Sequence, residues 1–121
     1  MQLTLSLILT CVLGNTPLPP VIINKSALPL FFENEETAFL HCQTMGNPPP
    51  TIQWSKIDLY ETYIVPLYGV LRIHQFRNGS LGFFPIHEED WGFYACQARN
   101  DHGSDVAYRN VCVGSELRFD Y

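Results

Sequence analysis

Two cysteines with a tryptophan between them, Cys42, Trp54 and Cys96, restrict the fold more than any other feature of the chain. Each falls on the apolar side of a segment that alternates between apolar and other side chains, as one face of a β-strand does. The three alternating segments are residues 38–43, 52–55 and 94–98. If the two cysteine strands lie in opposite sheets, a disulfide joins the sheets through the core and Trp54 packs against it. Such a bridge contributes about 4 kcal/mol in a small exported domain.

The rest of the chain follows the same all-β pattern. Turn residues recur about every 8 to 15 positions, and no segment shows a sustained helical period. Residues 21–23 are predicted to form a first edge strand, with residues 28–30 as its continuation. Leu71 and Ile73 are expected to face inward on a later strand, and the last strand is expected at residues 106–113. The Asn78-Gly79 pair predicts a hairpin turn, because both residue types tolerate a positive φ.

Size and charge limit the class of protein. A chain of 121 residues with 46% hydrophobic residues suits one compact domain. Its net charge of −5 argues against a nucleic-acid partner, which needs a basic footprint. It also gives no electrostatic attraction to an anionic membrane surface.

The N-terminus predicts export. Residues 3–13 form an uncharged apolar run that is far shorter than the roughly 20 residues needed to cross a bilayer. The length fits the core of a signal peptide over residues 1–14, although no Lys or Arg precedes the run. The alternative is that this run is a buried first strand of the domain.

Two acceptor triplets for N-glycosylation, at Asn24 and Asn78, agree with export. We therefore expect a secreted or extracellular protein, held at the cell surface if the chain is part of a longer membrane protein. No membrane insertion is expected of the chain itself. The predicted organisation is a leader at 1–14, an entry segment at 15–18, the domain at 19–114 and a polar tail at 115–121.

A second cluster lies just before the second cysteine. Tyr94 stands two residues ahead of Cys96 and follows an acidic corner that ends at Asp90. A buried tyrosine ring whose hydroxyl bonds back to such a corner is called a tyrosine corner. Tyr94 and Asp90 are therefore expected to belong, with Trp54, to the core of the domain.

With this cluster, the chain resembles an immunoglobulin domain of the I-set type. The matching residues are Pro19-Pro20, Leu40-His41-Cys42, Gly46-Asn47-Pro48, Ile52-Gln53-Trp54, Asn78-Gly79-Ser80-Leu81, Asp90 to Ala98 and Asn100-Asp101-His102-Gly103. They cover roughly residues 19–113. The resemblance implies an all-β, two-sheet Greek-key sandwich with one inter-sheet disulfide between Cys42 and Cys96.

Two residues depart from the pattern of that family. Trp91 stands where a small residue is usual, so it either caps the end of the sandwich or forms an exposed contact for a partner. Cys112 has the opposite parity to Val111 and Val113, so we expect it to point outward. Its three alternatives are a bridge to another chain or neighbouring domain, a free or capped thiol, and a bridge to Cys11.

The sequence offers no catalytic or metal-binding pattern. None of the four histidines has a second ligand at zinc spacing, and no segment resembles a nucleophile elbow or a phosphate loop. The acidic runs at 33–36 and 88–90 are expected to be solvated turns, because a calcium loop needs spaced oxygen ligands. We expect no enzyme activity, no cofactor and no bound metal.

The resemblance implies a role in binding proteins, as in adhesion molecules, guidance receptors and receptor-kinase ectodomains. Tyr60, Tyr63, Tyr68 and Trp91 are the candidate contacts, because an exposed tyrosine supplies a large contact area at small entropic cost. Alternatively, some of these tyrosines only cover the sandwich edge. Partner strands could also add to an edge strand.

Three roles remain open. The first is a recognition domain of the adhesion or receptor type, as a fragment or soluble isoform of a larger ectodomain. The second is a stand-alone secreted regulator that sequesters a ligand or masks a receptor. The third is a structural spacer, as in matrix or muscle proteins. The partner is expected to be a protein, and a disulfide-linked dimer through Cys112 is one form that it could take.

Overall fold

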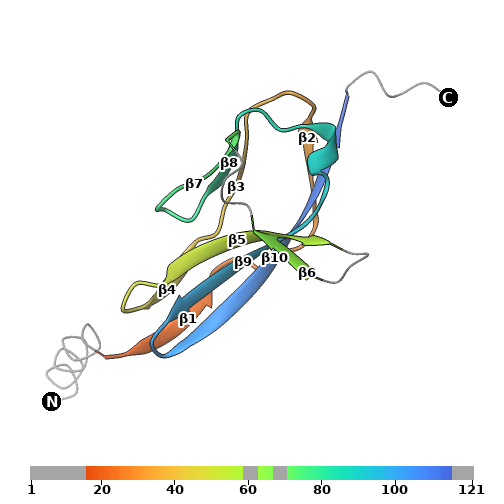
Figure 1. Cartoon of the computed structure of the whole chain (residues 1–121). Helices are drawn as coiled ribbons and strands as arrows, with labels where there is room; N and C mark the ends of the chain where they lie inside the picture. Colours follow the sequence, from red (N-terminus) through yellow and green to blue (C-terminus); the bar gives the residue numbers. More distant parts are fainter. Residues whose placement is uncertain (1–15, 59–62, 67–70, 116–121) are drawn as a thin grey trace, which may run out of the picture.

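The computed structural model describes residues 16–58, 63–66 and 71–115, which form a sandwich of two layers of strands (Figure 1). In chain order the elements are β1 Leu18–Ile22, β2 Pro29–Glu33, β3 Ala38–Leu40, β4 Thr44–Asn47, β5 Thr51–Asp58, β6 Tyr63–Pro66, β7 Ile73–Gln75, β8 Leu81–Phe83, the 3-10 helix η1 Glu88–Asp90, β9 Gly92–Asn100 and β10 Gly103–Gly114.

One layer is a five-stranded sheet in the order β2-β10-β9-β5-β6. The other contains a three-stranded sheet, β3-β8-β7, and the pair β1-β4. β4 follows β3 after a short break at Cys42. The β1-β4 pair therefore continues this second layer beyond the end of β3. All pairings are antiparallel except that of β2 with β10. The predicted all-β two-sheet sandwich is confirmed.

The first two strands differ from the prediction. Residues 28–30 do not continue the strand at 21–23, because β1 pairs with β4 while β2 pairs with β10 in the other layer. The chain thus crosses between layers after Ile23. Arg109, which is buried, holds this crossing by donating hydrogen bonds to the carbonyl oxygens of Asn24 (2.7 Å), Ser26 (3.4 Å) and His41 (3.1 Å).

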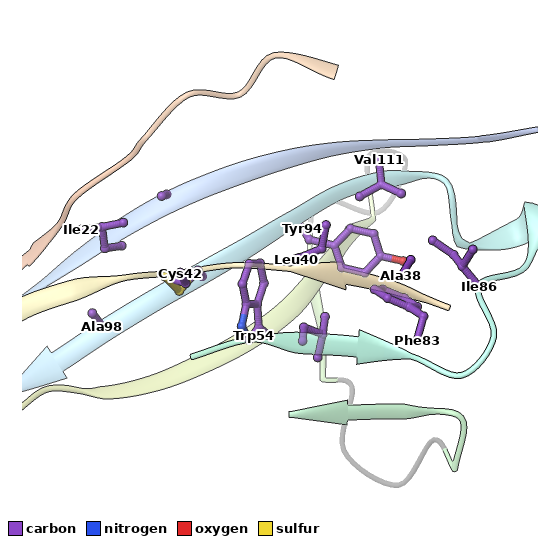
Figure 2. Close-up of a cluster of buried hydrophobic side chains, with 13 residues drawn as sticks. Ile22, Ala38, Leu40, Cys42, Trp54, Phe83, Ile86, Tyr94, Ala98 and Val111 are labelled. Carbon is purple, nitrogen blue, oxygen red and sulfur yellow. A yellow bond between two sulfur atoms is a disulfide. The ribbon is translucent and has the colours of Figure 1, made fainter. Parts of the chain in front are cut away.

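The core lies between the two layers (Figure 2). The disulfide between Cys42 and Cys96 joins the layers with 6.5 Å between the Cα atoms. Trp54 packs beside Cys42 and donates its indole N–H to the carbonyl of Gly79 at 2.8 Å. The fully buried core residues include Trp54, Tyr94, Phe83, Leu40, Leu81, Ile86 and Val111. The alternation in the sequence therefore identified the buried faces of the cysteine and tryptophan strands correctly.

The segment before β7 corrects one inward assignment. Leu71 is fully exposed, whereas Ile73 packs against the core. The reason is local: Leu71 and Arg72 lie in a turn, so the strand alternation begins only at Ile73. In the hairpin between β7 and β8, Gly79 has a φ of 95°, while Asn78 does not adopt a positive φ.

Candidate recognition surface

The corner before β9 is a rigid polar frame. Tyr94 is fully buried and donates its hydroxyl to the carbonyl of Asp90 at 2.6 Å. Burial raises the pKa of the Tyr94 phenol, so the hydroxyl remains a donor at neutral pH. The rings of Tyr94 and of Phe83 in the opposite layer meet edge to face, with centroids 5.8 Å apart. This arrangement is the tyrosine corner that the spacing to Cys96 predicts.

Arg72 completes the corner, and this role was not predicted from the sequence. Its guanidinium donates two hydrogen bonds to the carboxylate of Asp90, at 2.6 and 2.8 Å. The same carboxylate accepts the backbone N–H of His87 at 2.7 Å. Burial alone would raise the pKa of Asp90, but the bonds from Arg72 and His87 outweigh it and hold that pKa below its ordinary value. The pKa of Arg72 is raised by the same hydrogen bond.

Trp91 follows this frame directly. It is 56% exposed, which is unusual for so large an apolar side chain. Its backbone N–H bonds to the carbonyl of Glu88, so η1 fixes the position of its backbone. Of the two alternatives from the sequence, the exposed contact is the one that this exposure favours.

The outer face of the five-stranded sheet carries several exposed apolar side chains. On β10, Ala107, Arg109 and Val111 are buried, whereas Val106 and Tyr108 point outward. Phe31 on the neighbouring β2 lies outward too, because the next residue, Phe32, packs against the core, and Phe31 is 79% exposed. We call the outward residues Phe31, Val106 and Tyr108 the five-strand face.

Cys112 belongs to the same sheet face. It is half-buried, lies in register with Phe31, and is not in a disulfide within the described part of the chain. Both residues line an open depression of about 770 Å³ between β2 and the end of β10. The outward direction expected for Cys112 agrees with the burial of Val111 beside it. Cys11, its alternative partner, lies outside the described residues.

The structure does not describe the side chains of the predicted tyrosine contacts. Tyr60 and Tyr68 lie outside the described residues. Tyr63 begins β6, where its backbone pairs with Asp58 at the edge of the five-stranded sheet, and its side chain is not described. Of the predicted contacts, only Trp91 can therefore be placed on the surface.

A second exposed apolar surface was not predicted from the sequence. Phe39, Phe76 and Phe84 lie on the outer face of β3-β8-β7, with ring centroids 5.6 to 6.3 Å apart. His41 stacks on Phe39 and His74 meets the edge of Phe76. We call these five rings the aromatic patch. Phe39 on its alternating strand was the available signal, because the alternation places it on the outward side.

Among residues 16–58, 63–66 and 71–115, no group of three His, Cys, Asp or Glu side chains could hold a metal ion. Within those ranges no helix has the length and apolar character needed to cross a bilayer.

The sequence and the structure of this chain are similar to those of known proteins. The family model described as "Immunoglobulin domain" matches residues 19–100. The chain is 38% identical over 89 residues to the mouse basement membrane-specific heparan sulfate proteoglycan core protein, covering 74% of this chain and 2% of that protein. It is 36% identical over 74 residues to the chicken cell adhesion molecule DSCAM, covering 61% of this chain and 4% of that protein.

Among solved structures, immunoglobulin domains 1–4 of Sidekick-1 superpose with a TM-score of 0.68 and 31% sequence identity, over 78% of this chain and 24% of that one. The chain therefore spans only a small part of the length of the proteins that it matches. Since the family model covers more than half of the sequence, the chain belongs to the immunoglobulin domain family.

Proposed function

We propose that this domain recognises another protein outside the cell, as part of an ectodomain of the adhesion or receptor type. The observation that carries the proposal is the five-strand face, where Phe31 and Tyr108 are 79% and 44% exposed. Exposed apolar side chains on the outer face of a stiff sheet are a candidate interaction surface. The relation to a named cell adhesion molecule agrees with this role.

The frame beneath the face supports the same role. Arg109 and the disulfide hold β10 and β9 against the other layer, so the side chains of the face are already in place before a partner arrives. Preorganised side chains lose little entropy on binding.

Binding is tested with the secreted chain against an array of purified extracellular domains and against a second copy of itself. We expect saturable binding that Tyr108→Ser and Phe31→Ser each weaken at least about ten-fold, as truncation of a contact anchor does. Met45→Ser is the matched control, because Met45 is 63% exposed, between Tyr108 and Phe31, but lies on β4 in the other layer. The absence of binding at micromolar concentration, or equal loss in the control, would refute the proposal.

Export and covalent pairing belong to the same proposal. Intact mass of the chain secreted from animal cells is expected to show cleavage near Asn15, glycan mass and, without reductant, a doubled mass that Cys112→Ser abolishes. A monomer without glycan that retains Met1 would instead favour an intracellular spacer.

One observation favours a spacer as the second candidate. Figure 1 shows that β1 begins at one end of the sandwich and β10 ends at the other, which is the geometry of domains strung in series. The similarity to a basement-membrane core protein agrees with this arrangement. A spacer would bind none of the arrayed proteins, and the variants of the five-strand face would then change nothing.

A further inference from the structure

Recognition of a partner through the five-strand face does not explain why the aromatic patch on the other layer is exposed. Phe39, Phe76 and Phe84 are each 37–42% exposed, although their rings already contact one another. The rings lie low over β8, because a Cβ atom added at Gly82 would come within 2.7 to 3.0 Å of the rings of Phe84 and Phe39. The three phenyl rings stand at 48° to 83° to one another, so the patch offers both ring faces and ring edges. An aromatic surface of this kind suits a ligand with an apolar face of its own.

The turn at the end of this patch carries Asn78. The carbonyl of Phe76 accepts the N–H of Gly79 at 3.1 Å, and the N–H of Phe76 donates to the carbonyl of Ser80 at 2.8 Å. With Gly79 at positive φ, this is a type I turn closed by a G1 bulge. Phe76 and the exposed Asn78 are therefore held within one tight turn beside the patch.

The side chains of this turn are arranged for an attached sugar. The Oδ1 atom of Asn78 accepts the backbone N–H of Ser80 at 2.9 Å, so the amide nitrogen Nδ2 is the group left for attachment. On the other side of the turn, Ser80 is buried and its hydroxyl lies 3.0 Å from Nδ1 of His41, a member of the patch. Ser80 is thus accessible to a transferase only before the domain folds.

We propose that Asn78 carries an N-linked glycan whose first sugar packs against Phe76, so that the glycan covers the aromatic patch. Sugar C–H groups are the electropositive, apolar surface that the negative face of an aromatic ring attracts. The patch and the tethered sugar therefore bury each other's apolar surface at no cost in translational entropy. The inference rests on the extracellular location in the proposed function.

The sugar donor for the attachment step is an oligosaccharide on a lipid pyrophosphate. A bond forms between Nδ2 of Asn78 and the anomeric carbon of the first sugar. The bond from that carbon to the pyrophosphate oxygen breaks, and the lipid pyrophosphate leaves with the electron pair. The proton lost from Nδ2 passes to a base of the transferase.

Asn24 provides an internal control. It too is exposed, stands in an acceptor triplet and accepts the N–H of Ser26 through Oδ1 at 3.0 Å. The residue two positions before it, where Phe76 stands relative to Asn78, is the buried and aliphatic Ile22. A sugar at Asn24 is therefore expected to have no coupling to Phe76.

The test uses the full chain, secreted from animal cells behind a heterologous leader, so that its own route of export does not matter. Glycopeptide mass spectrometry measures occupancy at Asn78. Endoglycosidase trimming then leaves a single N-acetylglucosamine on Asn78. The stability of this form is compared with that of Asn78→Gln, once in the chain with Phe76 and once in Phe76→Ala. We expect the single sugar to raise the ratio of folded to unfolded protein about five-fold with Phe76 and to leave it almost unchanged with Phe76→Ala.

Ring-current shifts decide the question if Phe76→Ala does not fold. Protons of the first sugar in the unmutated chain are expected to shift upfield, and those of a sugar at Asn24 are not. An empty Asn78, a stabilisation that is independent of Phe76, or unshifted sugar protons would each overturn the proposal. The proposed recognition function would survive these results, because it is measured by partner binding through the other sheet.

Discussion

Among single residues, Asp90 links the turn before β7, η1 and β9 through its hydrogen bonds. Its carboxylate accepts three hydrogen bonds from Arg72 and His87, and its backbone carbonyl accepts the Tyr94 hydroxyl. We expect Asp90→Asn to lower the free energy of unfolding by about 2 to 3 kcal/mol at pH 7, because a part-buried guanidinium loses its charged partner. Urea denaturation measures this change. Glu89→Gln is the control, since the exposed Glu89 lies 4.0 Å from Arg72 and should matter little.

The same carboxylate predicts a dependence on pH. Its pKa in the folded domain lies below the ordinary value of 3.8, so its contribution to stability is complete above that value. The contribution is lost as the pH falls below 3.8 and through the depressed folded-state pKa of Asp90. Urea midpoints of the unmutated domain should therefore fall more steeply in this acid range than those of Asp90→Asn. Identical slopes would show that the Asp90 carboxylate is not specially stabilised.

Arg109 is the second residue with a large expected effect. The described contacts of its buried guanidinium are all carbonyl oxygens, and desolvation lowers its pKa. Arg109→Met should cost about 2 kcal/mol of stability, because the carbonyls of Asn24 and His41 lose their donors inside the protein. Thermal unfolding measures the loss. The exposed Arg99 on β9 gives the matched control Arg99→Met, and equal effects at both sites would contradict the role assigned to the crossing.

Some of these residue roles follow from the sequence and others do not. Cys42, Trp54 and Tyr94 are predictable because strand alternation and short spacings determine their direction. Arg72 and Arg109 are not, because their partners lie far along the chain and meet them only once the layers have packed. Arg72 lies in a turn, where strand alternation does not apply, and the inward parity of Arg109 does not show which carbonyl oxygens it will meet.

At the level of elements, Gln75 extends a sheet that β6 leaves unfinished. β6 pairs with β5 only from Ser55 onward. Before that point, the side chain of Gln75 on β7 accepts the N–H of Trp54 at 3.1 Å and donates to the carbonyl of Ile52 at 2.8 Å. One carboxamide thus replaces a strand partner and links the two layers at their edge.

Hydrogen exchange tests this link. Gln75→Leu should speed exchange of the Trp54 amide about five-fold, because the N–H loses its acceptor at the sheet edge. Gln53→Leu is the matched control on β5, where an exposed glutamine points outward. If the Trp54 amide exchanges equally fast in the unmutated domain and in Gln75→Leu, the side chain does not serve as a strand partner.

The order of the elements was only partly predictable. Turn residues mark where strands end, so the number and approximate place of most strands follow from the sequence. The crossing between β1 and β2 does not, because an edge strand has the same local pattern in either layer. The layer that β2 joins depends on β10. The edge of β10 pairs with β2, which lies some eighty residues earlier in the chain, and the parallel register places Phe31 opposite Cys112.

For the whole molecule, the sequence determines the frame far better than the surface that a partner would meet. Core positions are restricted on every side by packing, so a few residue types in order identify the fold. The five-strand face and the aromatic patch are restricted only on their inner side. Their exposure becomes visible once the layers are placed, and the partner that meets them is chosen by chemistry outside the chain.

The disulfide gives the last prediction, because it acts on the domain as a unit. It spans a sequence separation of 54 residues between the two layers, and a loop of this length corresponds to about 4 kcal/mol of lost unfolded-state entropy. Cys42→Ala combined with Cys96→Ala should therefore shift the urea midpoint far downward, towards the limit of stability of a domain of this size. Cys112→Ser, which removes the half-buried thiol outside the core, should leave the midpoint nearly unchanged. A double variant whose free energy of unfolding stays within about 1 kcal/mol of that of the unmutated domain would mean that Trp54 and the packed core alone hold the two layers together.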